Sequence, residues 1–238
     1  MPRFFSNQIA SNQIIITGED AKHITKVLRM KMGEAITVND KAGTDYECEI
    51  AEIGEQVILN VLTKHKNETE PNVEIVLYQA LPKSDKLDFI VQKAVELGVT
   101  KIVPMTTKFC IAKADEKSFE KKLIRYNKIV FEAAKQSGRG IIPLVENILS
   151  FEQAIQQGKD ECSILYYEHG GEPTACIVNS NTSKVNIYVG SEGGFSEQEV
   201  IYAKEHGIRL GTLGKLILRC ETAPIVGLSL VLNATNHM

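Results

Sequence analysis

The sequence predicts an α/β protein in which a small β-rich domain precedes a larger domain with a mostly parallel sheet. The first 65 or so residues contain short strand-like runs around one helical segment. A polar stretch, KHKNETEP at residues 64–71, has few apolar side chains and ends in proline, as linkers often do. After Val73, buried-strand patterns alternate with helical patterns, which favours a parallel sheet covered on both faces. We therefore expect domains at residues 1–68 and 72–238.

In the N-terminal part, β-branched and alternating runs predict strands, and an apolar stripe predicts one helix. Ile24, Val27 and Leu28 form this stripe within residues 19–30. Glycine-containing turns at residues 40–43 and 54–55 separate neighbouring strands. The predicted strands are residues 13–17, 35–38, 46–53 and 57–62. Such strands favour a small β-barrel-like domain.

The larger part contains clear helix boundaries. Gly98 ends one predicted helix, and Ser137 with Gly138 ends another. Capping-box spacing at residues 150–153 and 196–199 marks two helix starts. The predicted strands are residues 73–81, 102–105, 163–167 and 185–189, and the longer predicted helices are residues 87–97, 116–137, 197–206 and 222–233.

The composition is that of a globular protein with a sizeable core, because 43% of the 238 residues are hydrophobic and 24% are charged. No uninterrupted apolar run reaches the roughly 18 residues of a membrane-spanning helix. The first residues show no signal-peptide pattern, so we expect a cytoplasmic protein. The five cysteines have no CxxC spacing and the five histidines no HExxH pattern. We therefore expect free thiols and no metal.

The net charge of −3 argues against a protein held to nucleic acid by bulk charge alone. Two segments are nevertheless locally basic. Residues 22–31 contain four Lys/Arg, one His and no acid, and residues 113–139 contain eight Lys/Arg against four acids. By themselves, such segments fit solvated helix faces.

The segment VNIYVGSEGGFSEQEV, residues 185–200, places a glycine-rich turn between a buried strand and a capped helix. Backbone N–H groups of such a turn can approach a ligand closely, at the edge of the sheet where ligands bind in open α/β folds. A plain tight turn explains the three glycines almost as well. The spacing does not match GxGxxG or a P-loop, and GxSxG would need glycine at Val189. A nicotinamide oxidoreductase is therefore not supported.

The segment LGTLGKLILRCETAPIVGLSLV, residues 210–231, carries a charged pair beside a glycine loop. Gly211 and Gly214 bracket the loop, and Arg219 and Glu221 precede an apolar helix whose first turn accommodates Pro224. The charged pair fits either an ion pair that closes the domain or part of a functional site.

Together, GSEGGFSEQE and LGKLILRCETA resemble the signature pair of SPOUT-class methyltransferases, and within that class the chain resembles the RsmE family of small-subunit ribosomal RNA uridine-N3 methyltransferases. Four further blocks match this family in order: PRFF (2–5), HITKVLRMKMGE (23–34), ALPKSDKLDFIVQKAVELGVTKIVP (80–104) and EAAKQSGRGIIP (132–143). Ser191 departs from the pattern, because the family usually has proline there; serine allows the turn but loosens it. Cys220 is often threonine in relatives.

The resemblance implies a PUA-like β-barrel followed by a SPOUT-type, trefoil-knotted, mostly parallel α/β domain. It also implies homodimers in which the partner chain completes each site, and bent S-adenosylmethionine held by loops near residues 165–170, 190–194 and 213–218. The apolar helix at residues 223–232 is a candidate for the dimer interface or for plain core. The implied cofactor-binding residues are Leu165, Tyr166, Tyr167, Gly190, Glu192, Gly193, Leu213, Gly214, Ile217 and Leu218.

The implied reaction transfers a methyl group from a sulfonium to uridine N3, so the reacting groups must be positioned and the N3 proton must leave. Negative charge then spreads over N3, O2 and O4, where a fixed cation would stabilise it. Arg219 is our candidate for this cation because it stays protonated. Glu221 is a candidate base, although we prefer the alternative that it holds Arg219. Glu192 could face the sulfonium or the base.

Because N3 lies on the Watson–Crick edge, the uridine must leave its stack, and the protein must grip the flanking backbone. The residues expected to bind RNA phosphates are Arg3, Lys22, Lys26, Arg29 and Lys31 in the small domain, and Lys83, Lys86 and Arg139 beside the active site. Binding should depend on salt and favour an assembled small ribosomal subunit.

The sequence is also compatible with two other functions. The chain could be a non-catalytic RNA-binding ribosome-assembly factor, which would bind no S-adenosylmethionine. It could also be a SPOUT methyltransferase that acts on another RNA, such as transfer RNA, or on a ribose 2′-hydroxyl.

Overall fold

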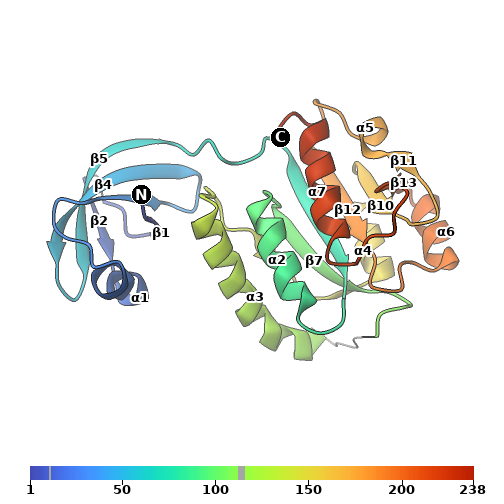
Figure 1. The fold of residues 1–238 in the computed structure, drawn as a ribbon, viewed down its shortest axis with the longest axis horizontal. Helices are drawn as coiled ribbons and strands as arrows, with labels where there is room; N and C mark the ends of the chain where they lie inside the picture. Colours follow the sequence, from blue (N-terminus) through green and yellow to red (C-terminus); the bar gives the residue numbers. More distant parts are fainter. Residues whose placement is uncertain (11, 112–115) are drawn as a thin grey trace. The chain divides into compact units, whose positions relative to one another are not determined.

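A computed structural model describes residues 1–10, 12–111 and 116–238 of the chain. The chain divides into two compact units (Figure 1). The first consists of residues 1–70 and 134–142, and the second of residues 71–133 and 143–238. A short segment near the middle of the sequence therefore belongs to the N-terminal unit.

The first unit is a five-stranded sheet with one short helical segment. The strands are β1 (Arg3–Phe5), β2 (Gln13–Ile16), β3 (Ala35–Asn39), β4 (Thr44–Ile53) and β5 (Val57–Lys66), in the order β1-β3-β4-β5-β2. β1 runs parallel to β3, and the other pairs are antiparallel. Helix α1 (Gly18–Lys22) continues into the π-helical turn η1 (His23–Val27). The core of this unit contains Phe4, Ile14, Ile24, Ile36 and Leu59.

Two predictions for this unit need correction. The helix expected at residues 19–30 ends at η1, and Arg29 beyond it has a φ of 53°, outside the right-handed helical region. Residues 64–66 of the expected linker continue β5, where Thr44 to Tyr46 pair with Lys66 to Lys64. Backbone pairing requires no apolar side chains, so a polar sequence can still form a strand end.

The second unit is a parallel sheet in the order β11-β13-β10-β12-β6-β7-β8, with β9 paired to β7. Its strands are β6 (Glu74–Ala80), β7 (Lys101–Thr106), β8 (Leu144–Val145), β9 (Leu149–Ser150), β10 (Ser163–Tyr166), β11 (Glu172–Pro173), β12 (Lys184–Val189) and β13 (Arg209–Thr212). Its helices are α2 (Lys86–Glu96), α3 (Glu116–Gln136), α4 (Phe151–Gly158), α5 (Thr174–Ile177), α6 (Glu197–Glu205) and α7 (Ala223–Ala234). The last residues of α3 belong to the first unit.

Helices cover both faces of this sheet (Figure 1). Side chains of α4 and α6 pack with Tyr78, Met105 and Tyr188 in one buried cluster. Because side chains alternate along a strand, Leu77 and Ile187 point to the opposite face. Helix α7 packs there against β6, β12 and α2. Both predicted capping boxes are present, at the starts of α4 and α6.

The observed units confirm a small β-rich part followed by a mostly parallel α/β part. No sequence pattern predicted β1, β8, β9, β11, β13 or α5, which are two to four residues long. Within the described residues, no helix is both long and apolar enough to cross a membrane. All five cysteines are free thiols.

Candidate functional site

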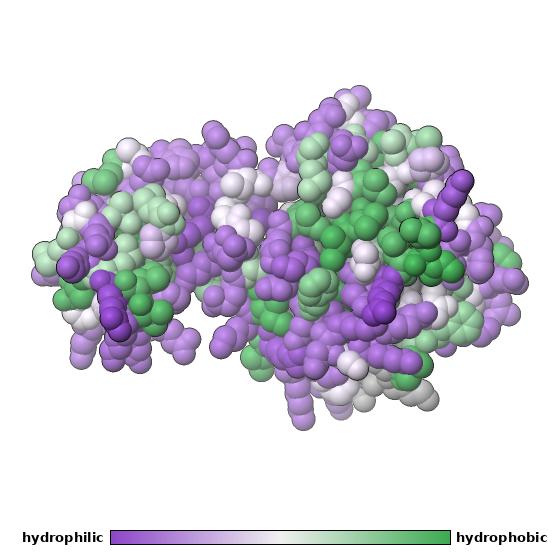
Figure 2. All heavy atoms as spheres, in the orientation of Figure 1, coloured by the Kyte–Doolittle hydropathy of each residue, from purple (hydrophilic) through white to green (hydrophobic). Residues whose placement is uncertain are grey.

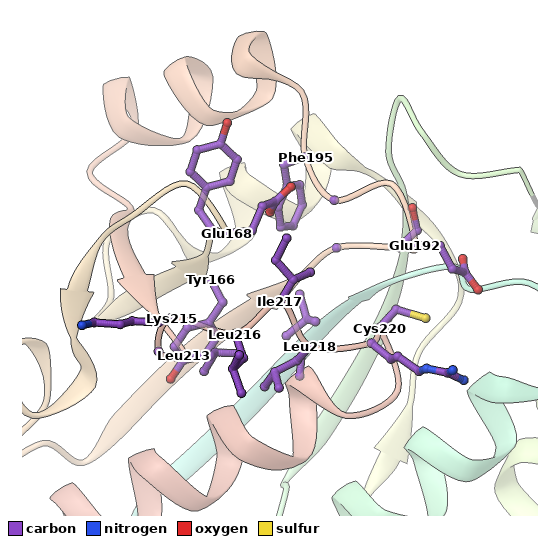
Figure 3. A pocket seen from close by; sticks show the side chains of 18 of the residues that line it. Tyr166, Glu168, Glu192, Phe195, Leu213, Lys215, Leu216, Ile217, Leu218 and Cys220 are labelled. Atoms are coloured by element: carbon purple, nitrogen blue, oxygen red, sulfur yellow. The ribbon is translucent and has the colours of Figure 1, made fainter.

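Three neighbouring parallel strands, β13, β10 and β12, end at the same edge of the sheet of the second unit. The segments that follow them contain Tyr167 and Glu168, the turn at residues 190–194, and residues 213–220. These segments surround a cavity of about 420 Å³ (Figure 3). This size and position are typical of a ligand site in an open α/β fold.

The glycine-rich turn is shaped by close approaches that other residues would prevent. A Cβ at Gly190 would lie 2.9 Å from the Cα of Gly194. Gly194 has a φ of +65°, and a Cβ there would lie 2.4 Å from the Glu168 carboxylate. A Cβ at Gly193 would lie 2.6 Å from the Phe109 side chain. The turn therefore needs glycine at all three positions.

The inner wall of the cavity includes Tyr166, which is almost fully buried. Its hydroxyl lies 3.0 Å from the Thr174 hydroxyl and donates to the Gly227 carbonyl at 3.4 Å. Burial raises the pKa of this phenol to about 12. Tyr166 is thus a neutral, fixed wall of the cavity at any physiological pH.

Eight of the ten expected cofactor-binding residues line the cavity: Tyr166, Tyr167, Gly190, Glu192, Leu213, Gly214, Ile217 and Leu218. Leu165 does not, because alternation along β10 points its side chain into the core shared with α4 and α6. Gly193 packs against Phe109 on the outside of the turn. Four further lining residues, Glu168, Ser191, Lys215 and Leu216, lie within the three expected loops but were not singled out. Phe195 and Ala223 lie outside those loops, and sequence reasoning missed them.

A charged cluster lies at one end of the cavity, where Figure 3 shows Glu192 and Cys220. The Lys86 ammonium lies 3.0 Å from a Glu192 oxygen and 3.1 Å from a Glu221 oxygen. Burial alone would raise the pKa of Glu192, but hydrogen bonds from Lys86 and from the Lys83 N–H outweigh it and lower that pKa to about 2. The pKa of Glu221 is also lowered. Burial alone would raise this pKa, but the hydrogen bond from Lys86 outweighs burial.

Cys220, between the two expected catalytic residues, is a buried thiol. It donates to Glu221 at 3.2 Å and lies 3.6 Å from the Lys86 ammonium. Burial and the hydrogen bond to Glu221 raise its pKa to about 12. A thiol that stays protonated is a poor nucleophile, so Cys220 supports the cluster as a hydrogen-bond donor.

Arg219 lines the cavity, as expected, but its side chain is 84% exposed. Its guanidinium lies 4.0 Å from Glu221, whereas the Lys86 ammonium lies 3.1 Å from the same carboxylate. The expectation that Glu221 mainly holds Arg219 therefore needs correction, because Glu221 primarily holds Lys86.

The basic residues expected to bind phosphates differ in their surroundings. Lys22, Lys26, Arg29, Lys31 and Lys83 are exposed. Lys86 is engaged in the charged cluster, which argues against its expected role as a free phosphate ligand. Residue 113, at the start of the second basic segment, lies outside the described residues.

Two arginines from the same expectation hold the first unit together instead. The Arg3 guanidinium contacts both Asp45 oxygens at 2.5 and 2.6 Å, and its side chain is 13% exposed. Arg139 is 2% exposed and pairs with Glu70, which also accepts the N–H groups of Gly140 and Ile141. Buried guanidinium groups with carboxylate partners cannot also bind RNA phosphates, so these two assignments were wrong.

The cavity contains no side-chain set typical of a metal site, and no group of three or more His, Cys, Asp or Glu residues with metal-binding geometry occurs among residues 1–10, 12–111 and 116–238. Its walls instead combine apolar side chains with backbone groups of glycine-containing turns. Such walls suit an organic ligand.

Comparison with known proteins identifies the family. Residues 69–232 match the model of an RNA methyltransferase domain, and residues 16–62 match that of an RNA methyltransferase PUA domain. Ribosomal RNA small subunit methyltransferase E of Bacillus subtilis is 37% identical over 226 residues, which cover 91% of this chain and 88% of that protein. The chain belongs to the ribosomal RNA small subunit methyltransferase E family.

A second relative and two solved structures match over more than nine-tenths of the chain. A second relative, ribosomal RNA small subunit methyltransferase E 2 of Borreliella burgdorferi, is 31% identical over 94% of this chain and 92% of its own. The solved structure of ribosomal RNA small subunit methyltransferase E from Neisseria gonorrhoeae bound to S-adenosyl methionine is 30% identical, covers 98% of this chain and 97% of its own, and has a TM-score of 0.88. A putative methyltransferase from Legionella pneumophila in complex with the same cofactor is 27% identical with a TM-score of 0.86 and the same coverage.

These matches confirm the predicted fold class, a PUA-like domain followed by a SPOUT-type α/β domain. They also confirm the family inferred from the six matching sequence blocks.

Proposed function

We propose that this chain transfers a methyl group from S-adenosylmethionine to N3 of a specific uridine in small-subunit (16S) ribosomal RNA, in the assembled subunit. The observation that carries this proposal is the cavity at the ends of β10, β12 and β13, in a chain whose full length matches methyltransferase E proteins. Lys86 and Glu192 line one end of the cavity, and Glu221, which does not line it, pairs with Lys86 from behind the wall.

The residues present fit S-adenosylmethionine. The Ser191 hydroxyl belongs to a residue that is only 7% exposed, lies in the cavity wall and has no hydrogen-bond partner among the described residues. A buried polar group without a partner is costly, so a polar ligand atom in this cavity would satisfy it. Leu216 and Ile217 add apolar surface that suits a purine ring.

When bound, the cofactor supplies an electrophilic methyl group, and the protein residues must orient the uracil while its N3 proton leaves to solvent water. Glu192 is ionised at neutral pH and has a pKa of about 2, so it is a weak base and serves to hold Lys86. Arg219 is exposed at the cavity and can approach uracil O2 or O4, where its charge would stabilise the anion formed at N3.

The exposed basic residues support a role of the first unit in RNA binding. Residues 22–31 contain no Asp or Glu, and all four basic residues of this segment are exposed: Lys22, Lys26, Arg29 and Lys31. We place phosphate contacts here and at Lys83, with the first unit as the RNA-binding domain and the second unit as the catalytic domain. Action on ribosomal RNA would place the protein in the cytoplasm.

A homodimer is the second part of the proposal. Leu216 and Ile217 are 82% and 83% exposed although both are apolar and line the cavity. Figure 2 shows apolar side chains gathered over α7 and the adjoining loops. Contiguous exposed apolar surface next to a site favours a protein partner, and a second copy of the chain would complete the cavity.

The test uses small subunits from a strain that lacks this protein, incubated with the pure protein and labelled cofactor. Mass mapping of the ribosomal RNA should reveal one new methyl group on a uridine base, and reverse transcription should stop there because the Watson–Crick edge is blocked. Arg219→Ala should lower kcat while calorimetry detects unchanged cofactor affinity. Cofactor binding without methylation of small-subunit RNA would support a different RNA substrate, and absent cofactor binding would support the assembly-factor alternative.

A further inference from the structure

The side chain of Lys86 joins two chain segments that are far apart in the sequence. Lys86 is the first residue of α2, Glu192 belongs to the glycine-rich turn after β12, and Glu221 precedes α7. Its ammonium lies 3.0 Å from Glu192, 3.1 Å from Glu221 and 3.6 Å from the Cys220 sulfur. Each of the three N–H donors of the ammonium therefore has a partner. Only 32% of the side chain is exposed.

Both joined segments form the cavity wall. Residues 190–192 and 213–220 line it from two sides, and Lys86 itself lines it. The Lys83 N–H also donates to both Glu192 oxygens, at 3.1 and 3.3 Å, so the start of α2 and the residues before it hold the turn at two points. The Glu221 carboxylate is held by the Cys220 thiol and the Lys86 ammonium.

We propose that Lys86 is a positioning residue that clamps the glycine-rich turn against the segment before α7, so that the cofactor cavity is formed before S-adenosylmethionine binds. This inference rests on the proposed function only in the identity of the cofactor. A preorganised cavity binds its ligand more tightly because the ordering of both segments is already complete.

Electrostatics explains why one lysine has a large effect. An isolated exposed ion pair contributes little to stability. Here a single cation lies between two carboxylates that are only 29% and 20% exposed. Without it, two like charges would remain at one end of the cavity, and their repulsion would push the two segments apart. The expected consequence is an open cavity in a protein that is otherwise folded.

The experiment compares Lys86→Met, Lys86→Arg and the control Lys93→Met by calorimetry with S-adenosylmethionine and by steady-state methylation of small subunits. Lys93 lies on the same helix, pairs with Glu96 at 2.8 Å and is 33% exposed, but is not part of the cavity wall. Lys86→Met should raise the Kd and the KM for the cofactor about tenfold, with kcat at saturating cofactor and the KM for RNA unchanged. Lys86→Arg should recover most of the affinity, and Lys93→Met should match the wild type.

Other outcomes would overturn the proposal. A higher KM for RNA with a shallower salt dependence and normal cofactor affinity would make Lys86 a phosphate ligand. A lower kcat at saturating concentrations of both substrates would make it a catalytic cation. If Lys86→Met does not fold in a thermal scan, Lys86→Arg and Glu221→Gln decide instead: normal cofactor affinity in Glu221→Gln would contradict the clamp. If the wild type binds the cofactor but methylates no ribosomal RNA, the proposed function is refuted. The cofactor Kd values of the Lys86 variants, measured by calorimetry, then still test the clamp.

Discussion

The hydroxyl of Tyr166 donates to the carbonyl of Gly227, and the edge of the Tyr166 ring lies against the Cα of that glycine. A Cβ at position 227 would lie 2.6 Å from the Cε2 atom of the ring. Helix α7 therefore approaches β10 closely because it has glycine at this point, although glycine lowers helix stability. The contact links α7 to the wall of the cofactor cavity.

Gly227→Ala should consequently displace Tyr166 and reduce stability. The ring lies between Gly211 and Gly227 and its hydroxyl is held by Thr174 and Gly227, so it can move only toward the cofactor cavity that it lines. We expect a loss of about 1–3 kcal/mol in the free energy of unfolding, as for other overpacked sites, together with weaker cofactor binding. Urea unfolding and calorimetry measure the two effects. Gly54→Ala is the control, because its nearest neighbour would lie at 3.7 Å; equal stability of the two variants would contradict the argument.

Ser191→Ala should weaken cofactor binding without destabilising the protein. The hydroxyl of Ser191 has no hydrogen-bond partner among the described residues, so its removal breaks no contact within the chain. If a polar cofactor atom satisfies this hydroxyl, its loss should cost about 1 kcal/mol, or roughly fivefold in Kd. Ser229→Ala, which removes a hydroxyl bonded to Ile225 within α7, should leave Kd unchanged. An unchanged Kd in Ser191→Ala would place the hydroxyl away from the ligand.

Arg139→Ala should unfold the first unit more easily rather than weaken RNA binding directly. It leaves Glu70 without its guanidinium partner, in a place where Glu70 also fixes the backbone of Gly140 and Ile141. Breaking a buried pair in this way costs about 3 kcal/mol. Urea unfolding would measure this loss. A variant with full stability but weaker binding to the small subunit would restore the phosphate assignment.

The sequence predicts the long elements and the glycine-rich turn, but neither the short strands nor the partners of charged residues. Long strands and helices follow from apolar periodicity, and the glycine-rich turn follows from residue type. Short strands such as β13 are held by neighbours distant in sequence, so local patterns do not reveal them. A charged residue carries no sign of its partner: Arg139 and Lys86 read as free cations until the fold brings Glu70, Glu192 and Glu221 beside them.

Replacing the exposed basic residues of the first unit with alanine should weaken binding to the small subunit and flatten its salt dependence. Lys22, Lys26, Arg29 and Lys31 are exposed, so each can contact a phosphate. Each lost phosphate contact should lower the slope of log K against log salt by about 0.7–0.9. Filter binding at several salt concentrations tests this, and calorimetry should detect unchanged cofactor affinity. An unchanged slope in the fourfold variant would exclude these residues from the RNA-binding surface.

The low pKa of Glu192 makes a pH-dependent prediction. The pKa falls from an ordinary value of 4.5 to about 2 on folding, so the ionised carboxylate stabilises the folded chain. This stabilisation is fully present above pH 4.5 and is lost as the pH falls toward 2. The difference in unfolding free energy between the wild type and Glu192→Gln should therefore stay constant from pH 8 to about pH 5 and shrink below it. In a Lys86→Met background the main cause of the low pKa is gone, so the pH-dependent part of the difference should be smaller and its loss should be complete at a higher pH. Urea unfolding between pH 3 and pH 8 measures both curves, and coinciding curves would show that Lys86 does not set the charge state of this carboxylate.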